Sequence, residues 1–236
     1  MYWLIPFSIG ITFLCVFLFF RVQEKRLIAV IFKGLTSLMF IVTGLVAWLN
    51  SQNPHGKFGI YVLIGLAFGL LGDVFLDLKF MDKKREDLFT ALGFITFGLG
   101  HISHITGLFT NYFDFSANPL YLIIPGVVTL LLVGVVILME KISKIKYQKM
   151  RPFVIIYGLL LFSSVTLFMS ASIQTGWNIQ TIWLMAISLI FFALSDLILN
   201  NTYFAPNCMG PGYIISNHVI YYAAQFAIAI SLFFLV

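Results

Sequence analysis

Long apolar runs follow one another along the whole chain, separated by short polar or Gly/Pro-bearing stretches. A helix needs roughly 20 apolar residues to cross a hydrocarbon core of about 30 Å, and the pattern predicts about eight such helices. We therefore expect an all-α, polytopic transmembrane bundle in which residues 1–236 form a single integral membrane domain. The predicted spans are 2–20, 27–49, 58–80, 88–109, 119–139, 151–172, 180–200 and 213–236.

The first span is expected to be a retained helix and not a signal peptide, because no basic segment precedes it and Arg21 follows it in place of a small-residue cleavage site. With 61% hydrophobic and 10% charged residues, the chain also lacks the polar surface of a soluble domain. The absence of a targeting segment and the short loops are typical of a bacterial cytoplasmic (inner) membrane protein.

The net charge of +5 does not indicate a nucleic-acid partner, because the basic residues sort by loop and form no patch. The loop between the second and third spans carries only Lys57. The positive-inside rule then places the odd-numbered loops in the cytoplasm and both termini outside. Twelve of the 14 lysines and arginines lie in these odd loops: Arg21, Lys25 and Arg26; Lys79, Lys83, Lys84 and Arg85; Lys141, Lys144, Lys146, Lys149 and Arg151.

Several ionisable side chains fall inside the predicted spans, where each costs about 2.5–3.5 kcal/mol at a helix centre. The free-energy cost of burying three such acids is too high unless they share a polar cavity. By the charge topology most of them lie in the cytoplasmic half of the membrane, while His101 lies near its middle. The residues are Lys33, Asp73, Asp77, His101 with His104, Asp196 and His218.

Helical spacing places these residues on three faces that can meet at one cavity. The first face carries Asp73 and Asp77, and the glycines at 65, 69 and 72 on the same span are expected to let a neighbouring helix approach closely. The second carries Asp196 and Asn200. The third carries His218, Tyr222 and Gln225.

The two halves of the chain resemble each other around the acids. LLGDVFLD at 70–77 aligns with ALSDLILN at 193–200, so that Asp73 falls opposite Asp196, and each segment precedes a helix with a histidine. The match predicts a 4+4 repeat of two parallel four-helix units.

Structural roles compete with functional ones at these positions. Asp77 could be an interfacial carboxylate paired with Lys79 or Lys83, and Lys33 could pair with an aspartate or extend to the inner surface. His101 and His104 could simply hydrogen-bond across helices.

The chain carries none of the common motifs of soluble enzymes: it has no Gly-rich phosphate loop, Gly-x-Ser-x-Gly elbow or His-Glu-x-x-His pair. Ser195 and Asp196 are adjacent on a helix and point apart, so they form no nucleophile and base. Cys15 lies in an apolar helix and Cys208 in a predicted cytoplasmic loop, which favours neither a disulfide nor a thiol metal site. Three candidate functions for the buried ionisable residues remain: acid–base chemistry by carboxylates, metal binding, or proton-coupled transport.

Four segments, taken in order, resemble the YhhN or lysoplasmalogenase family: GDVFLDL at 72–78, GLGHISH at 98–104, FFALSDLIL at 191–199 and HVIYYAAQ at 218–225. The family's second helix usually carries Lys-Pro, whereas this chain has Lys33-Gly34, so the local kink is not expected to be shared. The resemblance implies a membrane hydrolase that cleaves the vinyl ether bond of a lysophospholipid, lysoplasmalogen, to a fatty aldehyde and glycerophospho-ethanolamine or -choline.

Under this resemblance Asp73 and Asp196 are the expected catalytic acid and base, and neither a metal nor another cofactor is needed. Lys33 would lie near the phosphate or favour the ionised form of one aspartate. The residues expected to bind substrate or support the acids are Lys33, Asp77, His101, Ser195, Asn200, His218, Tyr222 and Gln225.

Three alternatives stay open at this stage. A zinc-dependent lipid hydrolase would use His101, His104 or His218 with an aspartate. A proton-coupled transporter would use Asp73 and Asp196 as a relay, although prolines that would break helices are scarce inside the spans. A degenerate family member would have no activity.

Overall fold

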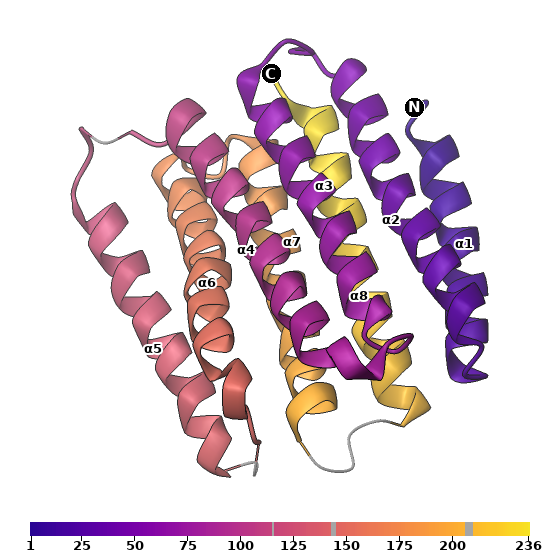
Figure 1. The fold of residues 1–236 in the computed structure, drawn as a ribbon. Helices are drawn as coiled ribbons and strands as arrows, with labels where there is room; N and C mark the ends of the chain where they lie inside the picture. The colour runs from indigo at the N-terminus through magenta and orange to yellow at the C-terminus, as the bar shows by residue number, and fades with distance from the viewer. Residues whose placement is uncertain (115, 143–144, 206–209) are drawn as a thin grey trace.

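The computed structural model describes residues 1–114, 116–142, 145–205 and 210–236. These residues form eight α-helices, three single-turn 3₁₀ helices and no strand (Figure 1). The helices are α1 (Leu4–Val22), α2 (Arg26–Leu49), α3 (Lys57–Leu78), α4 (Glu86–Asn111), α5 (Leu120–Ile142), α6 (Arg151–Gln174), α7 (Gln180–Phe204) and α8 (Pro211–Ser231).

All eight of these helices are long and apolar enough to cross a membrane, which confirms the predicted all-α bundle and makes the chain a multi-pass membrane protein. All but two of the predicted boundaries agree with the structure to within three residues. The helix α7 continues to Phe204 rather than ending at position 200, and α8 ends at Ser231 rather than at 236 and is followed by a 3₁₀ turn. The added turn is polar, and Asn201 Nδ2 and Thr202 Oγ1 donate to the carbonyls of Leu197 and Ile198 one turn earlier.

Consecutive helices pack as antiparallel pairs: α1 with α2, α3 with α4, α5 with α6 and α7 with α8. Between the pairs, α2 contacts α3 and α8, while α6 contacts α7 and α4. The contacts of α2 with α3 and α8 correspond to those of α6 with α7 and α4, as expected for a parallel 4+4 repeat. The repeat itself stays a prediction. The outer helices of this arrangement are α1 and α5, which lie at opposite edges of the bundle (Figure 1).

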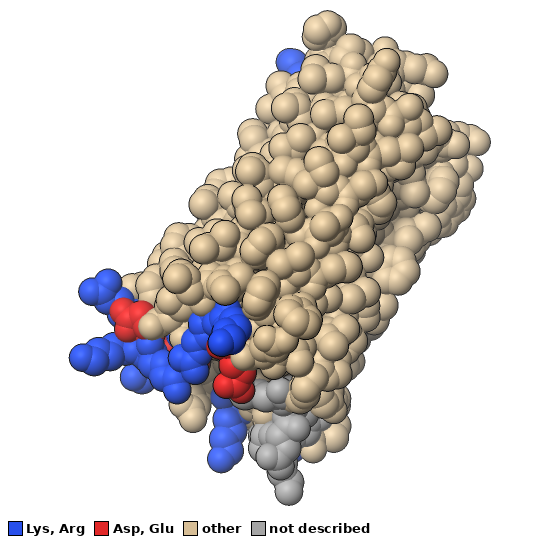
Figure 2. Space-filling view, turned by 90° about the vertical axis from the view of Figure 1, so that its right-hand side faces the viewer, with Lys and Arg blue, Asp and Glu red and all other residues tan. Residues whose placement is uncertain are grey.

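Basic residues gather at one end of the bundle, which we call the basic end (Figure 2). It contains the α1–α2, α3–α4 and α5–α6 connections, and both termini lie at the other end (Figure 1). The separation of charge between the two ends matches the loop pattern of the sequence. That the basic end faces the cytoplasm stays a prediction.

The glycines of α3 allow the close helix contacts that their spacing predicts. A Cβ at Gly65 would collide with the His104 ring, and one at Gly72 would lie 2.6 Å from a ring carbon of Phe97, so both positions bring α4 against the α3 backbone. A Cβ at Gly69 would lie 2.8 Å from Gln225 Nε2 of α8. The helix α3, which carries Asp73 and Asp77, is therefore enclosed by its neighbours.

Candidate functional site

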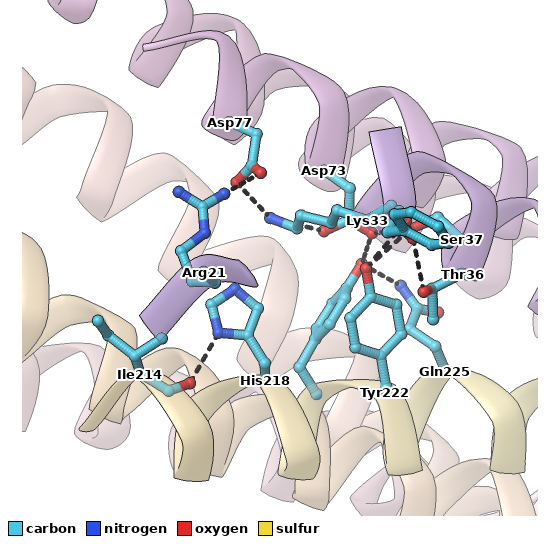
Figure 3. A network of polar contacts seen from close by, with 12 residues as sticks. Arg21, Lys33, Thr36, Ser37, Asp73, Asp77, Ile214, His218, Tyr222 and Gln225 are labelled. Carbon is cyan, nitrogen blue, oxygen red and sulfur yellow. Dashed lines mark hydrogen bonds and ion pairs between the residues drawn. The ribbon is translucent and has the colours of Figure 1, made fainter. Parts of the chain in front are cut away.

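Asp73 is held by three donors from two other helices. Its carboxylate accepts hydrogen bonds from Ser37 Oγ of α2 at 2.6 Å and from Tyr221 Oη of α8 at 2.8 Å, and Lys33 Nζ lies 3.3 Å from its Oδ1 (Figure 3). Lys33 and Ser37 are one helical turn apart, so one face of α2 supplies both a cation and a hydroxyl. Asp73 itself is only 2% exposed. These three donors are the partners that an ionised carboxylate needs away from water.

Asp77 pairs with two cations in the same cluster. It forms an ion pair with Arg21 at the end of α1, and Lys33 Nζ lies 3.1 Å from its Oδ1 (Figure 3). The prediction that Asp77 pairs with Lys79 or Lys83 is therefore wrong. The ammonium of Lys79 instead lies over the Tyr203 ring, 2.9 Å from its centroid.

Together Arg21, Lys33, Asp73 and Asp77 balance two positive charges against two negative ones. Lys33 is only 4% exposed and is fixed between the two carboxylates, so it does not extend to the surface. Neutral pairing explains how the bundle tolerates these charges inside a span, where an unpaired one would be costly.

Asp196 of α7 has different surroundings. It accepts a hydrogen bond from the Tyr157 hydroxyl of α6, and no basic side chain in the described part of the chain lies within ion-pair distance of it. Asp196 and Asp73 nevertheless line one cavity of about 20 Å³, which we call the central cavity. Its remaining lining residues are Lys33, Leu76, Phe97, Leu199, Tyr203, Asn217, His218 and Tyr221.

Two further cavities flank the central one, and Leu199 and Tyr203 of α7 line all three. The first, the mouth, has a volume of about 470 Å³ and lies at the basic end. The second, the slot, has a volume of about 50 Å³ and is mostly apolar. The mouth is lined by Arg21, Glu24, Arg26, Asp77, Lys79, Phe80, Lys83, Glu86, Leu199, Thr202, Tyr203, Ile214, Asn217 and His218. The slot is lined by Phe94, Val136, Val154, Tyr157, Gly158, Leu161, Phe162, Ala193, Asp196, Leu197, Leu199, Asn200, Tyr203 and Phe204.

The model for the YhhN family matches residues 11–232, nearly the whole chain. The chain belongs to the YhhN family. None of the curated proteins and none of the solved structures matches it significantly. The matched residues include every helix that contributes to the central cavity of this YhhN protein.

The histidines of the YhhN protein do not converge on one site: the rings of His101 and His104 of α4 are 6.3 Å apart between centroids, and His218 lies on α8. His218 lines the central cavity and the mouth, and its Nδ1 lies 2.7 Å from the Ile214 carbonyl oxygen. His101 is deeper and bonds Ser164 of α6 at 2.9 Å, which confirms the hydrogen bond across helices that we considered for it. His104 packs against Gly65. Among the described residues no three His, Cys, Asp or Glu side chains come together as a metal site, and Cys208 lies outside these residues.

The other predicted residues have mixed positions. Tyr222 contacts Ser37 Oγ at 3.1 Å, and Gln225 Nε2 donates to the Tyr221 hydroxyl at 2.9 Å, so both support Asp73 indirectly. Asn200 lines the slot with Asp196 but not the central cavity, because its side chain bonds the Tyr147 hydroxyl at 2.9 Å. Ser195 lines none of the three cavities, since its hydroxyl donates to the Phe192 carbonyl at 2.7 Å.

Four contributors were not predicted from the sequence: Arg21, Ser37, Tyr157 and Tyr221. Ser37 could have been found, because it lies one turn after Lys33 on the same face. Tyr221 could also have been found, since it precedes Gln225 by one turn. No pattern singles out Tyr157, which lies in a helix without other ionisable groups near it. Arg21 resembled an ordinary loop-flanking residue.

Proposed function

We propose that this YhhN protein hydrolyses the vinyl ether bond of lysoplasmalogen, releasing a fatty aldehyde and a glycerophospho-ethanolamine or -choline. The observation that carries the proposal is that two carboxylates line one small cavity in different surroundings. Asp73 is paired with a cation, whereas Asp196 is bonded by a neutral hydroxyl. Family membership supports the same reaction class.

Vinyl ether hydrolysis needs one acid and one carboxylate. A proton added to the carbon β to oxygen turns the vinyl ether into an oxocarbenium ion, which water captures. One group must therefore hold a proton near neutral pH, and another must stabilise positive charge and activate water.

The partners of the two aspartates support one division of these roles. Lys33, Ser37 and Tyr221 all stabilise the negative form of Asp73, which suits it to stabilise the cation and take a proton from water. Asp196 accepts from the Tyr157 hydroxyl, lies beside the Ser195 hydroxyl and has no cation within ion-pair distance among the described residues, and such surroundings favour the neutral carboxylic acid. Asp196 is thus the acid and Asp73 the base.

The proton balance closes within this pair. Asp196 gives its proton to the β carbon, and the vinyl π bond becomes a C–H bond. Water adds to the oxocarbenium carbon while Asp73 accepts its proton, which leaves a hemiacetal. As the hemiacetal collapses, Asp196 takes its hydroxyl proton, the C–O bond to glycerol breaks, and Asp73 returns its proton to the departing oxygen. One water is consumed and both groups are restored.

The three cavities share Leu199 and Tyr203, and their order favours one orientation of a single-chain lipid. Its charged head would occupy the mouth, its vinyl ether the central cavity, and the first part of its hydrocarbon chain the slot, which Asp196 and Tyr157 border. The bond to be cleaved lies between the polar head and the chain, as this order requires.

The decisive experiment measures aldehyde release from a synthetic lysoplasmalogen by purified protein in detergent. We expect Asp196→Asn and Asp73→Asn each to lower kcat by about 10²–10⁴-fold, the usual contribution of a general acid or base. Asp87→Asn, at an exposed carboxylate outside the central cavity, is the matched control and should stay active. Loss of activity in the control, or full activity in Asp196→Asn, would refute the assignment.

Two rival functions are tested in the same preparation. Inactivation by a chelator, with recovery on adding zinc, would replace the carboxylate mechanism by a metal-dependent one. Uptake of the intact lipid by proteoliposomes, without aldehyde, would indicate a transporter. The transporter is less favoured because each described span is one continuous helix, without the broken helices common in such proteins.

A further inference from the structure

The mouth carries charges of both signs that remain available to a ligand. Arg21 is paired with Asp77, whereas Lys83, Glu24 and Glu86 have no ion-pair partner among the described residues. Arg26 is exposed and donates to the Phe80 carbonyl at 3.1 Å, which holds its guanidinium at the rim. A zwitterion with one anionic and one cationic group complements this set.

We propose that the mouth is a head-group site that selects a phosphate bearing a primary amine, phosphoethanolamine, over phosphocholine. The inference rests on the proposed function, since it concerns the head of the same lipid. The phosphate would bind Arg26 and Lys83, and the ammonium would bind Glu24 and Glu86. A volume of about 470 Å³ lies within the usual range for small-molecule sites.

The phosphate is assigned to Arg26 and Lys83 because the third free cation is a poor candidate. Lys79, one residue beyond the end of α3, is only 6% exposed, and its ammonium lies over the Tyr203 ring. Burial lowers the pKa of Lys79 to about 7, against the opposing effect of Glu86, so it carries a full charge only below neutral pH. Arg26 and Lys83 are both exposed at the rim.

Selectivity between the two amines follows from what their charges need. A quaternary ammonium cannot donate hydrogen bonds and is usually held by open aromatic faces. The aromatic rings of the mouth, Phe80 and Tyr203, each already have a basic side chain over the ring, with Arg21 lying 4.8 Å from the Phe80 centroid and Lys79 lying 2.9 Å from that of Tyr203. These ring faces are therefore occupied and not open to a quaternary ammonium.

A primary ammonium instead donates up to three hydrogen bonds and needs carboxylates. Glu86 begins α4 and Glu24 lies in the α1–α2 connection, so the two reach the mouth from separate segments. Glu24 takes a left-handed backbone conformation with φ 58°, which a residue other than glycine adopts at a cost. The carboxylates thus supply hydrogen-bond acceptors that the ethanolamine ammonium can use and the choline trimethylammonium, which has no N–H, cannot.

The test compares two lysoplasmalogens that share a chain and differ only in the head. For the wild type we expect kcat/KM to be about tenfold higher for the ethanolamine lipid. The double variant Glu24→Gln/Glu86→Gln should raise KM for the ethanolamine lipid by about tenfold, leave its kcat and both constants for the choline lipid unchanged, and so abolish the preference. Lys83→Gln should raise KM for both lipids.

Asp87→Asn is the matched control, because Asp87 also lies in the first turn of α4 but does not line the mouth. Equal use of both lipids by the wild type, or an equal loss of preference in Asp87→Asn, would overturn the head-group site. If neither lipid releases aldehyde, the proposed function fails. Binding of the non-hydrolysable alkyl ether analogues then decides whether the mouth is a head-group site. Preferential binding of the ethanolamine analogue, lost in the double variant, would support the site, and equal binding would refute it.

Discussion

The two halves of the bundle present the same residue to the central cavity with different partners. In the first half, Asp73 of α3 receives an ammonium from Lys33 of the preceding helix. In the second half, Asp196 of α7 receives a hydroxyl from Tyr157 of the preceding helix. In the alignment that places Asp73 opposite Asp196, Lys33 falls opposite Ile156, next to Tyr157.

The comparison teaches how one scaffold can give two like carboxylates separate tasks. A cation beside one of them stabilises its charge, while a neutral hydroxyl beside the other leaves it free to keep a proton. Asp73 receives Lys33 and Ser37 from α2 and Tyr221 from α8, whereas Asp196 receives the Tyr157 hydroxyl from α6 and no cation within ion-pair distance among the described residues. Changing those donors is therefore the most direct way to test the division.

The largest effect is expected when the charged partner is removed. Lys33→Met leaves Asp73 and Asp77 with Arg21 as their only cation, and breaking such a buried pair usually costs about 3–5 kcal/mol. We expect the melting temperature in detergent to fall on the order of 10 °C, and aldehyde release to fall with it.

A compensating variant separates charge balance from lost packing. In Lys33→Met/Asp73→Asn the remaining ion pair of Arg21 with Asp77 is neutral, so much of the thermal stability should return while activity stays absent. If the double variant is no more stable than Lys33→Met alone, charge balance is not what Lys33 provides. Melting curves of both variants in one detergent decide the point.

Removing a neutral donor should have a smaller effect, and it should differ between the halves. Tyr157→Phe removes the hydroxyl that another helix donates to Asp196, whereas Tyr221→Phe takes one of three donors from Asp73. We expect kcat to fall about tenfold in Tyr157→Phe and less in Tyr221→Phe, consistent with roughly 1–3 kcal/mol for an unmet buried partner. Equal losses would contradict the contrast between the two carboxylates.

Hydropathy predicted the eight helices well, because lipid leaves the backbone few alternatives to a helix that satisfies its own hydrogen bonds. The cost of burying charge likewise singled out Asp73, Asp196 and Lys33, and these residues do line one cavity. Both inferences depend on the membrane as solvent and need no knowledge of how the helices pack.

Side-chain pairings between helices were harder to predict, since they depend on how each helix is rotated about its axis and how deep each side chain lies in the bundle. Nearby lysines were considered as structural partners of Asp77, but the end of α1 brings Arg21 to it from 56 residues away. Asn200 shares a face with Asp196 yet is drawn aside by Tyr147. The contact of Tyr157 with Asp196 can be found only when α6 is packed against α7, and sequence periodicity does not predict that packing.

The slot provides the last and mildest test, because it lies beside Asp196 and not beside Asp73. At Gly158 an added Cβ would meet only a methyl group of Val133 at 3.8 Å, so a larger side chain can enter the slot without displacing backbone. If the slot holds the hydrocarbon chain, Gly158→Leu should raise KM severalfold for long-chain lysoplasmalogens and little for short-chain ones. The matched control is Gly134→Leu, at an exposed position of α5 where an added Cβ meets nothing within 4 Å. An equal rise in KM for all chain lengths, or the same change in the control, would mean that the hydrocarbon chain does not occupy the slot. The two halves of the bundle would then differ only in the partners of their carboxylates.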